Sequence, residues 1–310
     1  MYMMKKYITL CVVAFAAVVL LFTVATTTKQ TSTLSTDKRL HITTSFYPLY
    51  FFASQIVGSH ADVINITPSG AEPHDYEPTP QDILSINKSQ LLFLNGGNLE
   101  AWGEKIQQII DPKQTTVVTI GADITTQTVD EDGKTIIDPH VWLSPKLAEV
   151  EVKRIENAIE AKDPANKNTY QQNATALLEK LNTLDTEYTQ GLRSCTQHTI
   201  VTSHAAFGYL ATEYHLTQLP IAGLSPDEEP SAQQMASIAQ FAKEHQIHTI
   251  FFESLVSPKL SQTIASEIGA QTLVLDPIEG VSKQESQEGK NYFTIMEDNL
   301  RNLRMALQCH

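Results

Sequence analysis

Residues 147–192, LAEVEVKRIENAIEAKDPANKNTYQQNATALLEKLNTLDTEYTQGL, decide how the rest of the chain is organised. The stretch has almost no strand signal and much helical composition, and Asp163-Pro164 ends one helix and starts the next. The apolar residues of the second helix, about 165–192, include Ala176, Leu177, Leu181 and Leu184. At roughly 1.5 Å per residue this helix is about 40 Å long, which is the height of a domain.

Strand signals alternate with helical segments on both sides of this stretch. The apolar strand candidates are residues 41–46, 61–67, 91–96, 115–121, 199–204, 216–223, 249–254 and 272–276. Such alternation favours parallel sheets that helices cover on both faces. We therefore predict an α/β fold in which one long rigid helix joins two parallel-sheet lobes. The predicted bounds are 39–163 for the N-terminal lobe, 164–193 for the linking helix and 194–310 for the C-terminal lobe.

The beginning of the chain is typical of an exported protein. Lys5 and Lys6 precede residues 7–28, which contain no charged side chain. A short basic start before about twenty apolar residues is a signal peptide or a membrane anchor, and we assign residues 1–25 to it. Residues 26–38 are rich in Thr and Ser and predict a flexible tether. We expect the rest to lie in the periplasm or at the cell surface, held there by the N-terminal segment if it is not cleaved.

The charge balance excludes one class of partner. The 310 residues include 22 basic and 35 acidic side chains, for a net charge of −13. Removing residues 1–25 removes two lysines and no acid, which leaves 20 basic against 35 acidic side chains and a net charge of −15. Nucleic acids require basic patches, so we expect none as a partner. The acidic surface is compatible with long-range attraction of cations.

Four metal-ligating side chains stand where predicted strands or lobes end, two in each half. They are His74, His140, His204 and Asp276. Ligands of open α/β sheets bind at the carboxyl ends of the strands, and a neighbouring proline stiffens the backbone at three of the four positions. Neutral imidazole and carboxylate suit zinc, and four protein ligands give a closed tetrahedral shell. The sequence therefore predicts a transition-metal site.

Six segments, in chain order, carry a family resemblance. They are GAEPHDYEPTPQD, DPHVWLSP, TSHAAFGYLA, GLSPDEEPSAQQM, FFESLVSPKLSQTIASEIGA and LVLDPIEG. Together they resemble the metal-binding receptors of bacterial ABC importers for zinc and manganese, from about His41 to the C-terminus. The resemblance implies two α/β lobes, one long linking helix and a metal buried in the cleft between the lobes. The ligands that it implies are His74, His140, His204 and Asp276.

The resemblance also implies a function. It indicates a monomeric receptor, not an enzyme, that captures Zn²⁺ outside the membrane and delivers it to the permease of an ABC importer. Zinc-type members tend to have histidine at the third ligand position and manganese-type members glutamate, so His204 favours zinc. Two features depart from the pattern. Residues 125–138, TTQTVDEDGKTIID, lack the long His-rich loop of many zinc receptors, and the usual lipid-anchoring cysteine is missing.

The sequence leaves three alternative functions open. A manganese-type receptor, a zinc-dependent hydrolase and an adhesin with a structural metal are the alternatives. A hydrolase needs an open coordination position and a general base, and the chain has no HExxH motif. Glu72 could be an outer acceptor or an alternate ligand, and Glu253 could orient a ligand imidazole. The other histidines are expected to be structural or solvated: His41, His60, His198, His215, His245 and His248.

Two cysteines remain beyond the N-terminal segment, Cys195 and Cys309. In an exported protein this pair suggests one disulfide, while two unrelated buried thiols are the alternative.

Overall fold

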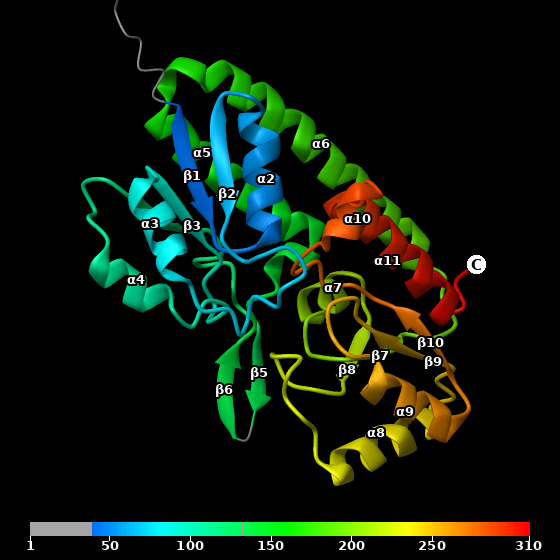
Figure 1. The fold of residues 1–310 in the computed structure, drawn as a ribbon. Helices are drawn as coiled ribbons and strands as arrows, with labels where there is room; N and C mark the ends of the chain where they lie inside the picture. Colours follow the sequence, from blue (N-terminus) through cyan, green and yellow to red (C-terminus); the bar gives the residue numbers. More distant parts are fainter. Residues whose placement is uncertain (1–38, 132) are drawn as a thin grey trace, which may run out of the picture. The chain divides into compact units, whose positions relative to one another are not determined.

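A computed structural model describes residues 39–131 and 133–310, which contain two four-stranded parallel sheets (Figure 1). The strand orders are β2-β1-β3-β4 and β10-β9-β7-β8. The bounds of these strands are Leu40–Thr44 (β1), Ala61–Asn65 (β2), Leu91–Leu94 (β3), Thr116–Thr119 (β4), Thr199–Thr202 (β7), Thr217–Pro220 (β8), Thr249–Phe252 (β9) and Gln271–Val274 (β10). We call each sheet with its helices the N-terminal or the C-terminal lobe. The predictions for residues 1–25 and 26–38 lie outside the described residues.

Helices connect the strands in both lobes. Their bounds are Tyr47–Val57 (α2), Pro80–Lys88 (α3), Gly103–Ile109 (α4), Pro145–Lys162 (α5), Lys167–Leu192 (α6), Gly208–Glu213 (α7), Ala232–Glu244 (α8), Lys259–Ile268 (α9), Lys283–Gln287 (α10) and Tyr292–Ala306 (α11). Short 3-10 turns at Val141–Leu143 and Pro164–Asn166 precede α5 and α6. Within the described residues, none of these helices combines the length and the hydropathy that crossing a membrane requires.

The 26-residue helix α6 runs from the N-terminal lobe to the C-terminal lobe (Figure 1). It packs against α2, α5 and α11. Its buried residues recur every three or four positions and form one stripe: Tyr170, Ala174, Leu177, Leu181, Leu184, Tyr188 and Leu192. Ala176, one of the apolar residues noted in the sequence, lies outside this stripe and is exposed. The predicted fold class, two parallel α/β lobes joined by one long helix, is confirmed.

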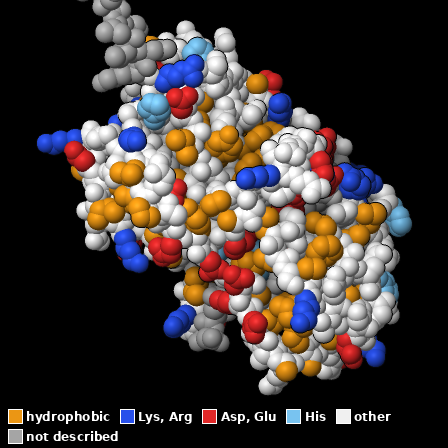
Figure 2. Space-filling view, in the orientation of Figure 1, with side chains coloured by type: hydrophobic (Ala, Val, Ile, Leu, Met, Phe, Trp, Pro, Cys, Tyr) orange, Lys and Arg blue, Asp and Glu red, His pale blue; other side chains and the backbone are white. Residues whose placement is uncertain are grey.

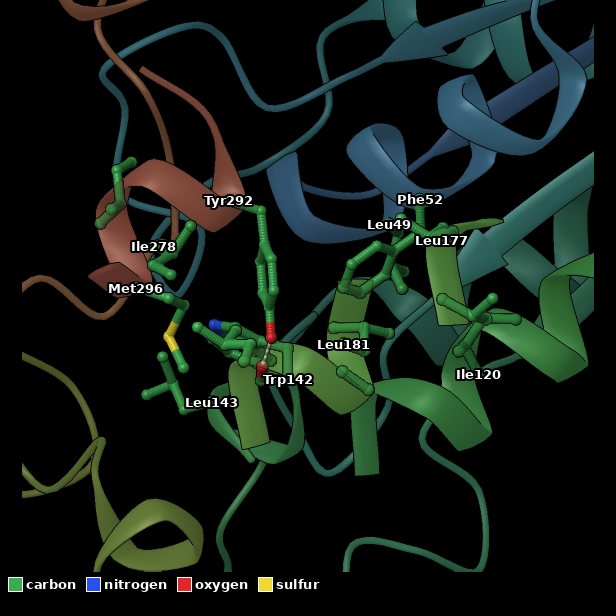
Figure 3. Packing of buried hydrophobic residues seen from close by; sticks show 14 of the residues in the cluster. Leu49, Phe52, Ile120, Trp142, Leu143, Leu177, Leu181, Ile278, Tyr292 and Met296 are labelled. Atoms are coloured by element: carbon green, nitrogen blue, oxygen red, sulfur yellow. Dashed lines mark hydrogen bonds between the residues drawn. The ribbon is translucent and has the colours of Figure 1, made fainter. Parts of the chain in front are cut away.

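Both sheets are buried on both faces, as parallel strands with near-continuous apolar sequence require. In β3, Leu91 and Phe93 belong to the core that includes α2, α5 and α6, while Leu92 and Leu94 belong to a separate core with α3 and α4. The larger core continues into the C-terminal lobe, as Figure 3 shows for the residues around Trp142.

Two hydrogen bonds join the lobes within this core. Trp142 Nε1 donates to the Pro277 carbonyl over 2.7 Å, and the Tyr292 hydroxyl donates to the Trp142 carbonyl over 2.6 Å. The 3-10 turn after residue 140 and the loop after β10 are therefore tied together by buried contacts. The Trp142 side chain is fully buried and serves core packing.

Two features lie outside the sheets. An antiparallel hairpin of Thr128–Glu131 (β5) and Lys134–Ile137 (β6), which we did not predict, projects from the N-terminal lobe (Figure 1). A disulfide joins Cys195, after α6, to Cys309, after α11, across 114 positions of sequence. The predicted disulfide is therefore present in the structure.

Candidate metal site

Three histidines and one glutamate converge between the lobes, each in a segment that follows a strand. His74 lies in the proline-rich loop after β2, and His140 follows the hairpin strand β6. His204 lies two residues after the end of β7, and Glu279 lies in the loop after β10. Every predicted strand ends at least two residues earlier than expected, so the residues at the carboxyl ends of the strands belong to loops.

The donor atoms of these four side chains have tetrahedral spacing. Nε2 of His140 lies 3.2 Å from Nε2 of His74 and 3.3 Å from Nε2 of His204. Glu279 Oε1 lies 3.2 Å from His74 Nε2, 3.1 Å from His140 Nε2 and 3.3 Å from His204 Nε2. A tetrahedron with a centre about 2.0 Å from each corner, the zinc–nitrogen distance, has edges of about 3.3 Å. Five of the six separations therefore match the edges of such a tetrahedron, and all four ligand atoms lie within 4.8 Å of one another.

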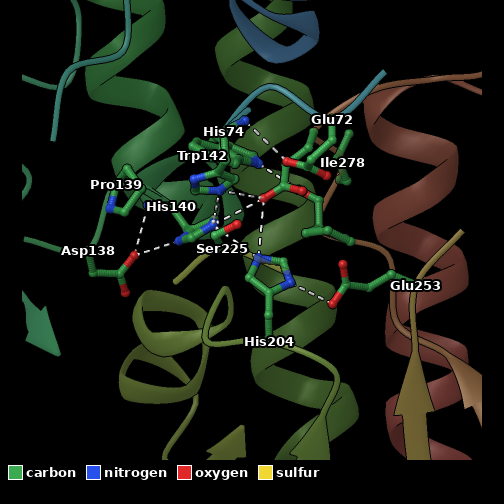
Figure 4. Close-up of polar contacts among 12 residues, drawn as sticks. Glu72, His74, Asp138, Pro139, His140, Trp142, His204, Ser225, Glu253 and Ile278 are labelled. Carbon is green, nitrogen blue, oxygen red and sulfur yellow. Dashed lines mark hydrogen bonds and ion pairs between the residues drawn. The ribbon is translucent and has the colours of Figure 1, made fainter. Parts of the chain in front are cut away.

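Two of the imidazoles are oriented by carboxylates (Figure 4). His140 Nδ1 lies 2.8 Å from Asp138 Oδ1, which also accepts from the His140 backbone N–H over 2.9 Å. His204 Nδ1 lies 2.6 Å from Glu253 Oε1, and Ser203 Oγ donates to the same oxygen. Such pairs fix the ring and leave the Nε2 lone pair free for a metal. The sequence reasoning named Glu253 for this task and missed Asp138.

Asp276, predicted to be the fourth ligand, does not lie among the imidazoles, and this prediction is corrected by the structure. Its Oδ1 accepts from the Ile278 backbone N–H over 2.7 Å, and its Oδ2 accepts from Ser254 Oγ. Its backbone N–H donates to Asn299 Oδ1 over 2.8 Å. These hydrogen bonds stabilise the conformation of the loop after β10. Burial is the main cause that raises the pKa of Asp276 to about 7.

Glu279 takes the place among the imidazoles because the loop reverses between the two acids. Ile278 has a φ of 59°, a left-handed conformation that β-branched residues rarely adopt. Two hydrogen bonds hold that reversal: the Ile278 backbone N–H donates to Asp276 Oδ1, and Trp142 Nε1 donates to the Pro277 carbonyl. Glu279 belongs to the motif LVLDPIEG, but its role depends on the left-handed turn at Ile278, which could not be predicted from the sequence.

The electrostatics of the group suit a cation. Burial would raise the pKa of Glu279, but the charge of His204 and the hydrogen bonds of the three imidazoles hold it well below its usual value. Burial would lower the pKa of His204, but Glu253 and Glu279 raise it well above 6.5, and Asp138 and Glu279 likewise raise that of His140. The carboxylates therefore attract positive charge, a proton or a metal ion, to these rings.

His74 differs from the other two imidazoles. Burial lowers its pKa in spite of the nearby Glu279 carboxylate. Its side chain keeps 9% of its surface exposed, whereas His140 and His204 keep 0%. Glu72 Oε1 accepts from the His74 backbone N–H over 3.3 Å and does not contact the ring.

On the outer surface, acidic side chains gather near the junction of the lobes (Figure 2).

The remaining histidines are placed as expected, away from the group of metal-ligating atoms found in the described residues. His41 pairs with Asp62 and His245 stacks on Phe241, while His198 is exposed. The four-residue group is therefore set apart by geometry and burial from the solvated histidines.

Comparison with known proteins gives a consistent family. Residues 42–306 match the protein family described as "Zinc-uptake complex component A periplasmic". The high-affinity zinc uptake system protein ZnuA of Bacillus subtilis (strain 168) is 40% identical, over 98% of this chain and 99% of that protein. The zinc-binding lipoprotein AdcA of Streptococcus pneumoniae (strain ATCC BAA-255 / R6) is 36% identical over 87% of this chain, which spans 56% of that longer protein.

A solved structure gives the same result. The Zn(II)-bound ZnuA-like domain of Streptococcus pneumoniae AdcA superimposes with a TM-score of 0.76 at 37% identity. The match covers 87% of this chain and 99% of that domain.

Proposed function

The chain belongs to the zinc-uptake complex component A family, and on that premise we propose that it is an extracytoplasmic receptor for Zn²⁺. It binds the ion with high affinity and delivers it to the permease of an ABC importer. The observation that carries this proposal is the set of four donor atoms, of which five of the six separations match the edges of a zinc tetrahedron. In this proposal the ion is cargo, and it is held until the receptor meets its permease.

We infer that the ligands are His74, His140, His204 and Glu279. Asp276 supports the loop of Glu279 and does not touch the ion. Three nitrogens and one carboxylate oxygen in a tetrahedron favour Zn²⁺ over Mn²⁺, which prefers more oxygen donors, so we propose a zinc-type rather than a manganese-type receptor.

The same geometry weighs against a hydrolase. A hydrolytic zinc site keeps one position for water, whereas four protein donors leave the tetrahedral shell closed. Two carboxylates that lie beside the ligand rings, Asp138 and Glu253, are both engaged with imidazole Nδ1 atoms. They orient ligands and are not placed as general bases. We therefore propose binding and release, not chemical conversion, as the function.

Export and assembly complete the proposal. We propose that residues 1–25 direct export or anchor the chain and that residues 26–38 form a tether. The lobes then occupy residues 39–163 and 194–310, with residues 164–193 as the linking helix, and the receptor acts as a monomer on a membrane-embedded permease. Support for this arrangement comes from the charge-free N-terminal segment and from the family of a periplasmic uptake component.

A matched pair of acid variants tests the ligand assignment. Glu279→Gln removes the charge of the carboxylate and leaves only a weak amide oxygen as donor, so zinc affinity should fall by more than the roughly 10–100-fold typical of outer-shell changes. Asp276→Asn alters the acid originally expected to be the ligand and should cost much less. Chelator competition on purified protein gives both affinities, and X-ray absorption counts three nitrogens and one oxygen on zinc in the wild type.

The exposed His198→Ala serves as a control for the loss of a solvated imidazole. Wild-type protein that fails to bind zinc would reject the proposed function. If Asp276→Asn and Glu279→Gln lose affinity in the opposite order, the function stands but Asp276, not Glu279, is the ligand.

A further inference from the structure

The ligand His140 is held by an acid that belongs to the base of the β5–β6 hairpin. Asp138 Oδ1 receives two hydrogen bonds from His140, one from the backbone and one at Nδ1. The Asp138 backbone N–H donates to the Gln127 carbonyl over 2.9 Å, across the base of the hairpin. The position of His140 therefore depends on where this hairpin base sits.

Helix α7 of the C-terminal lobe grips that base. The Tyr209 hydroxyl accepts from the Gln127 backbone N–H over 3.0 Å and donates to the Asp138 carbonyl over 3.1 Å. Gln127 Nε2 also donates to Thr212 Oγ1, one turn further along the same helix, over 3.0 Å. Tyr209 keeps 4% of its surface exposed, so these two bonds are made in a largely dry contact between the lobes, where lost partners are costly.

Gly208, the first residue of α7, lies against the Asp138 carboxylate, where there is no room for a side chain. A Cβ at Gly208 would lie 2.6 Å from Asp138 Oδ2 and 3.1 Å from Gln127 Oε1. The Asp138 carboxylate thus occupies the space that any other residue at 208 would fill. Glycine here permits the close approach of helix and carboxylate that the grip needs.

The segment that leads into α7 contains another of the four ligands. His204 lies four residues before Gly208, in the turn that leads from β7 into α7. One short segment of the C-terminal lobe therefore carries His204 itself and also holds the acid that orients His140 from the N-terminal lobe.

From these contacts we propose that Tyr209 and Gly208 are positioning residues for the metal, which act through Asp138 on His140. The grip of α7 on the hairpin base keeps His140 in its ligating orientation only while the lobes are together. Release of zinc to the permease then begins with the parting of α7 from the hairpin base, which frees Asp138 and with it the His140 ring. This inference rests on the proposed function, since it concerns the same four ligands.

The variant Tyr209→Phe tests it, because it keeps the ring and removes both hydrogen bonds. Zinc dissociation, followed by transfer to an excess of chelator, should become about 10-fold faster, as expected for an outer-shell change. Gly208→Ala should also speed dissociation, although alanine favours a helix, because its Cβ displaces the Asp138 carboxylate. A purely structural role for residue 208 would give the opposite sign, with α7 more stable and zinc retained at least as well.

Tyr214→Phe is the matched control. Tyr214 follows the same helix and is buried, but its hydroxyl donates to Asp185 Oδ1 in α6, away from the site, over 3.0 Å. It should lower the melting temperature of the metal-free protein about as much as Tyr209→Phe does and leave zinc dissociation unchanged. Cobalt(II) in the wild type gives a reference visible spectrum, which Tyr209→Phe should alter and Tyr214→Phe should not.

A double-mutant cycle decides whether Tyr209 acts through Asp138. Asp138→Asn alone should speed zinc dissociation, and adding Tyr209→Phe to it should then have little further effect, because coupled residues are not additive. The inference is overturned if Tyr209→Phe releases zinc at the wild-type rate, or if its effect is fully additive with that of Asp138→Asn. Wild-type protein without zinc affinity would instead reject the proposed function, an outcome visible before any variant is made.

Discussion

His74 and His204 present the same atom, Nε2, to the site, but their surroundings differ. His204 is fully buried just after β7, and its Nδ1 is held by Glu253 at 2.6 Å. His74 lies in a loop that contains Pro68, Pro73 and Pro78, with its side chain 9% exposed and with Glu72 bonded to its backbone rather than its ring. One ring is held by a buried hydrogen bond and the other by stiff backbone at the edge of the site.

This difference suggests separate tasks. A ring fixed by a buried carboxylate offers high affinity, because its orientation is set before the metal arrives. A ring at the partly exposed edge can yield to water or to an approaching ion without disturbing the core. We expect His74 to be the ligand that closes on the incoming ion and His204 to be the one that anchors it.

The largest expected effect comes from deleting each ring. His204→Ala removes a ligand and leaves the Glu253 carboxylate buried without its imidazole partner, which adds a desolvation penalty. His74→Ala leaves an opening that water can fill as a replacement ligand. Changes in the outer shell of a metal site typically cost about 10–100-fold in affinity. Loss of a ligand should cost more, so we expect zinc affinity to fall by well over 100-fold for His204→Ala. The loss for His74→Ala should be about ten times smaller than that for His204→Ala. Competition calorimetry against a chelator measures both, and equal losses would remove the distinction between anchor and closing ligand.

The two histidines of this comparison could be predicted as candidate ligands because their signal is local. His74 lies in the proline-rich loop that follows a predicted strand, and His204 ends the run TIVTSH. Each therefore stands at the carboxyl end of a strand, where parallel sheets bind ligands. The fold was equally readable, since alternating strands and helices stop at 144 and resume at 199 around one long helical stretch. These features depend on the period and composition of short segments.

What could not be predicted depends on loop conformation. The choice between Asp276 and Glu279 rests on the left-handed backbone of Ile278, which no residue type there would suggest. The β5–β6 hairpin was missed because its strands are mostly exposed and polar and thus lack an apolar period. Asp138 was missed with it, because its role follows from the hairpin base that places it beside His140.

The second expected effect is on pH dependence. Glu253 and Glu279 raise the pKa of His204 well above 6.5 against the effect of burial, so this ring keeps its proton to higher pH than an ordinary histidine does in the metal-free protein. Zinc must displace that proton, so apparent affinity rises with pH by roughly tenfold per unit for each proton displaced. His74, with its lowered pKa, is already neutral and releases none. Affinity at about pH 5.5 should therefore be well below that at about pH 7.5.

Calorimetry at neutral pH in buffers of different ionisation enthalpy counts the protons released. His204→Ala should release fewer than wild type, and His74→Ala the same number. The free energy of unfolding of the metal-free protein should fall as pH rises, whereas zinc affinity rises. A raised folded-state pKa contributes stability that is fully present below about pH 6.5 and lost as pH rises through the folded-state value. A proton count that falls with His74→Ala instead would contradict the assignment of the titrating ring.

The smallest expected effect separates the two glutamates that accompany these rings. Glu253→Gln keeps an acceptor oxygen for His204 Nδ1 but removes its charge, so zinc affinity should fall by about 10-fold. Burial and the charge of Glu279 raise the pKa of Glu72 to about 10, so its carboxyl is neutral at pH 7 and Glu72→Gln replaces it with a neutral group of the same shape. That variant should change zinc affinity by less than about twofold, or roughly 0.5 kcal/mol, because glutamine keeps the oxygen that accepts from the His74 backbone N–H. Chelator competition on both proteins, with melting temperatures as the control for folding, gives the result, and a loss for Glu72→Gln as large as for Glu253→Gln would show that Glu72 reaches the ion or its ligands directly.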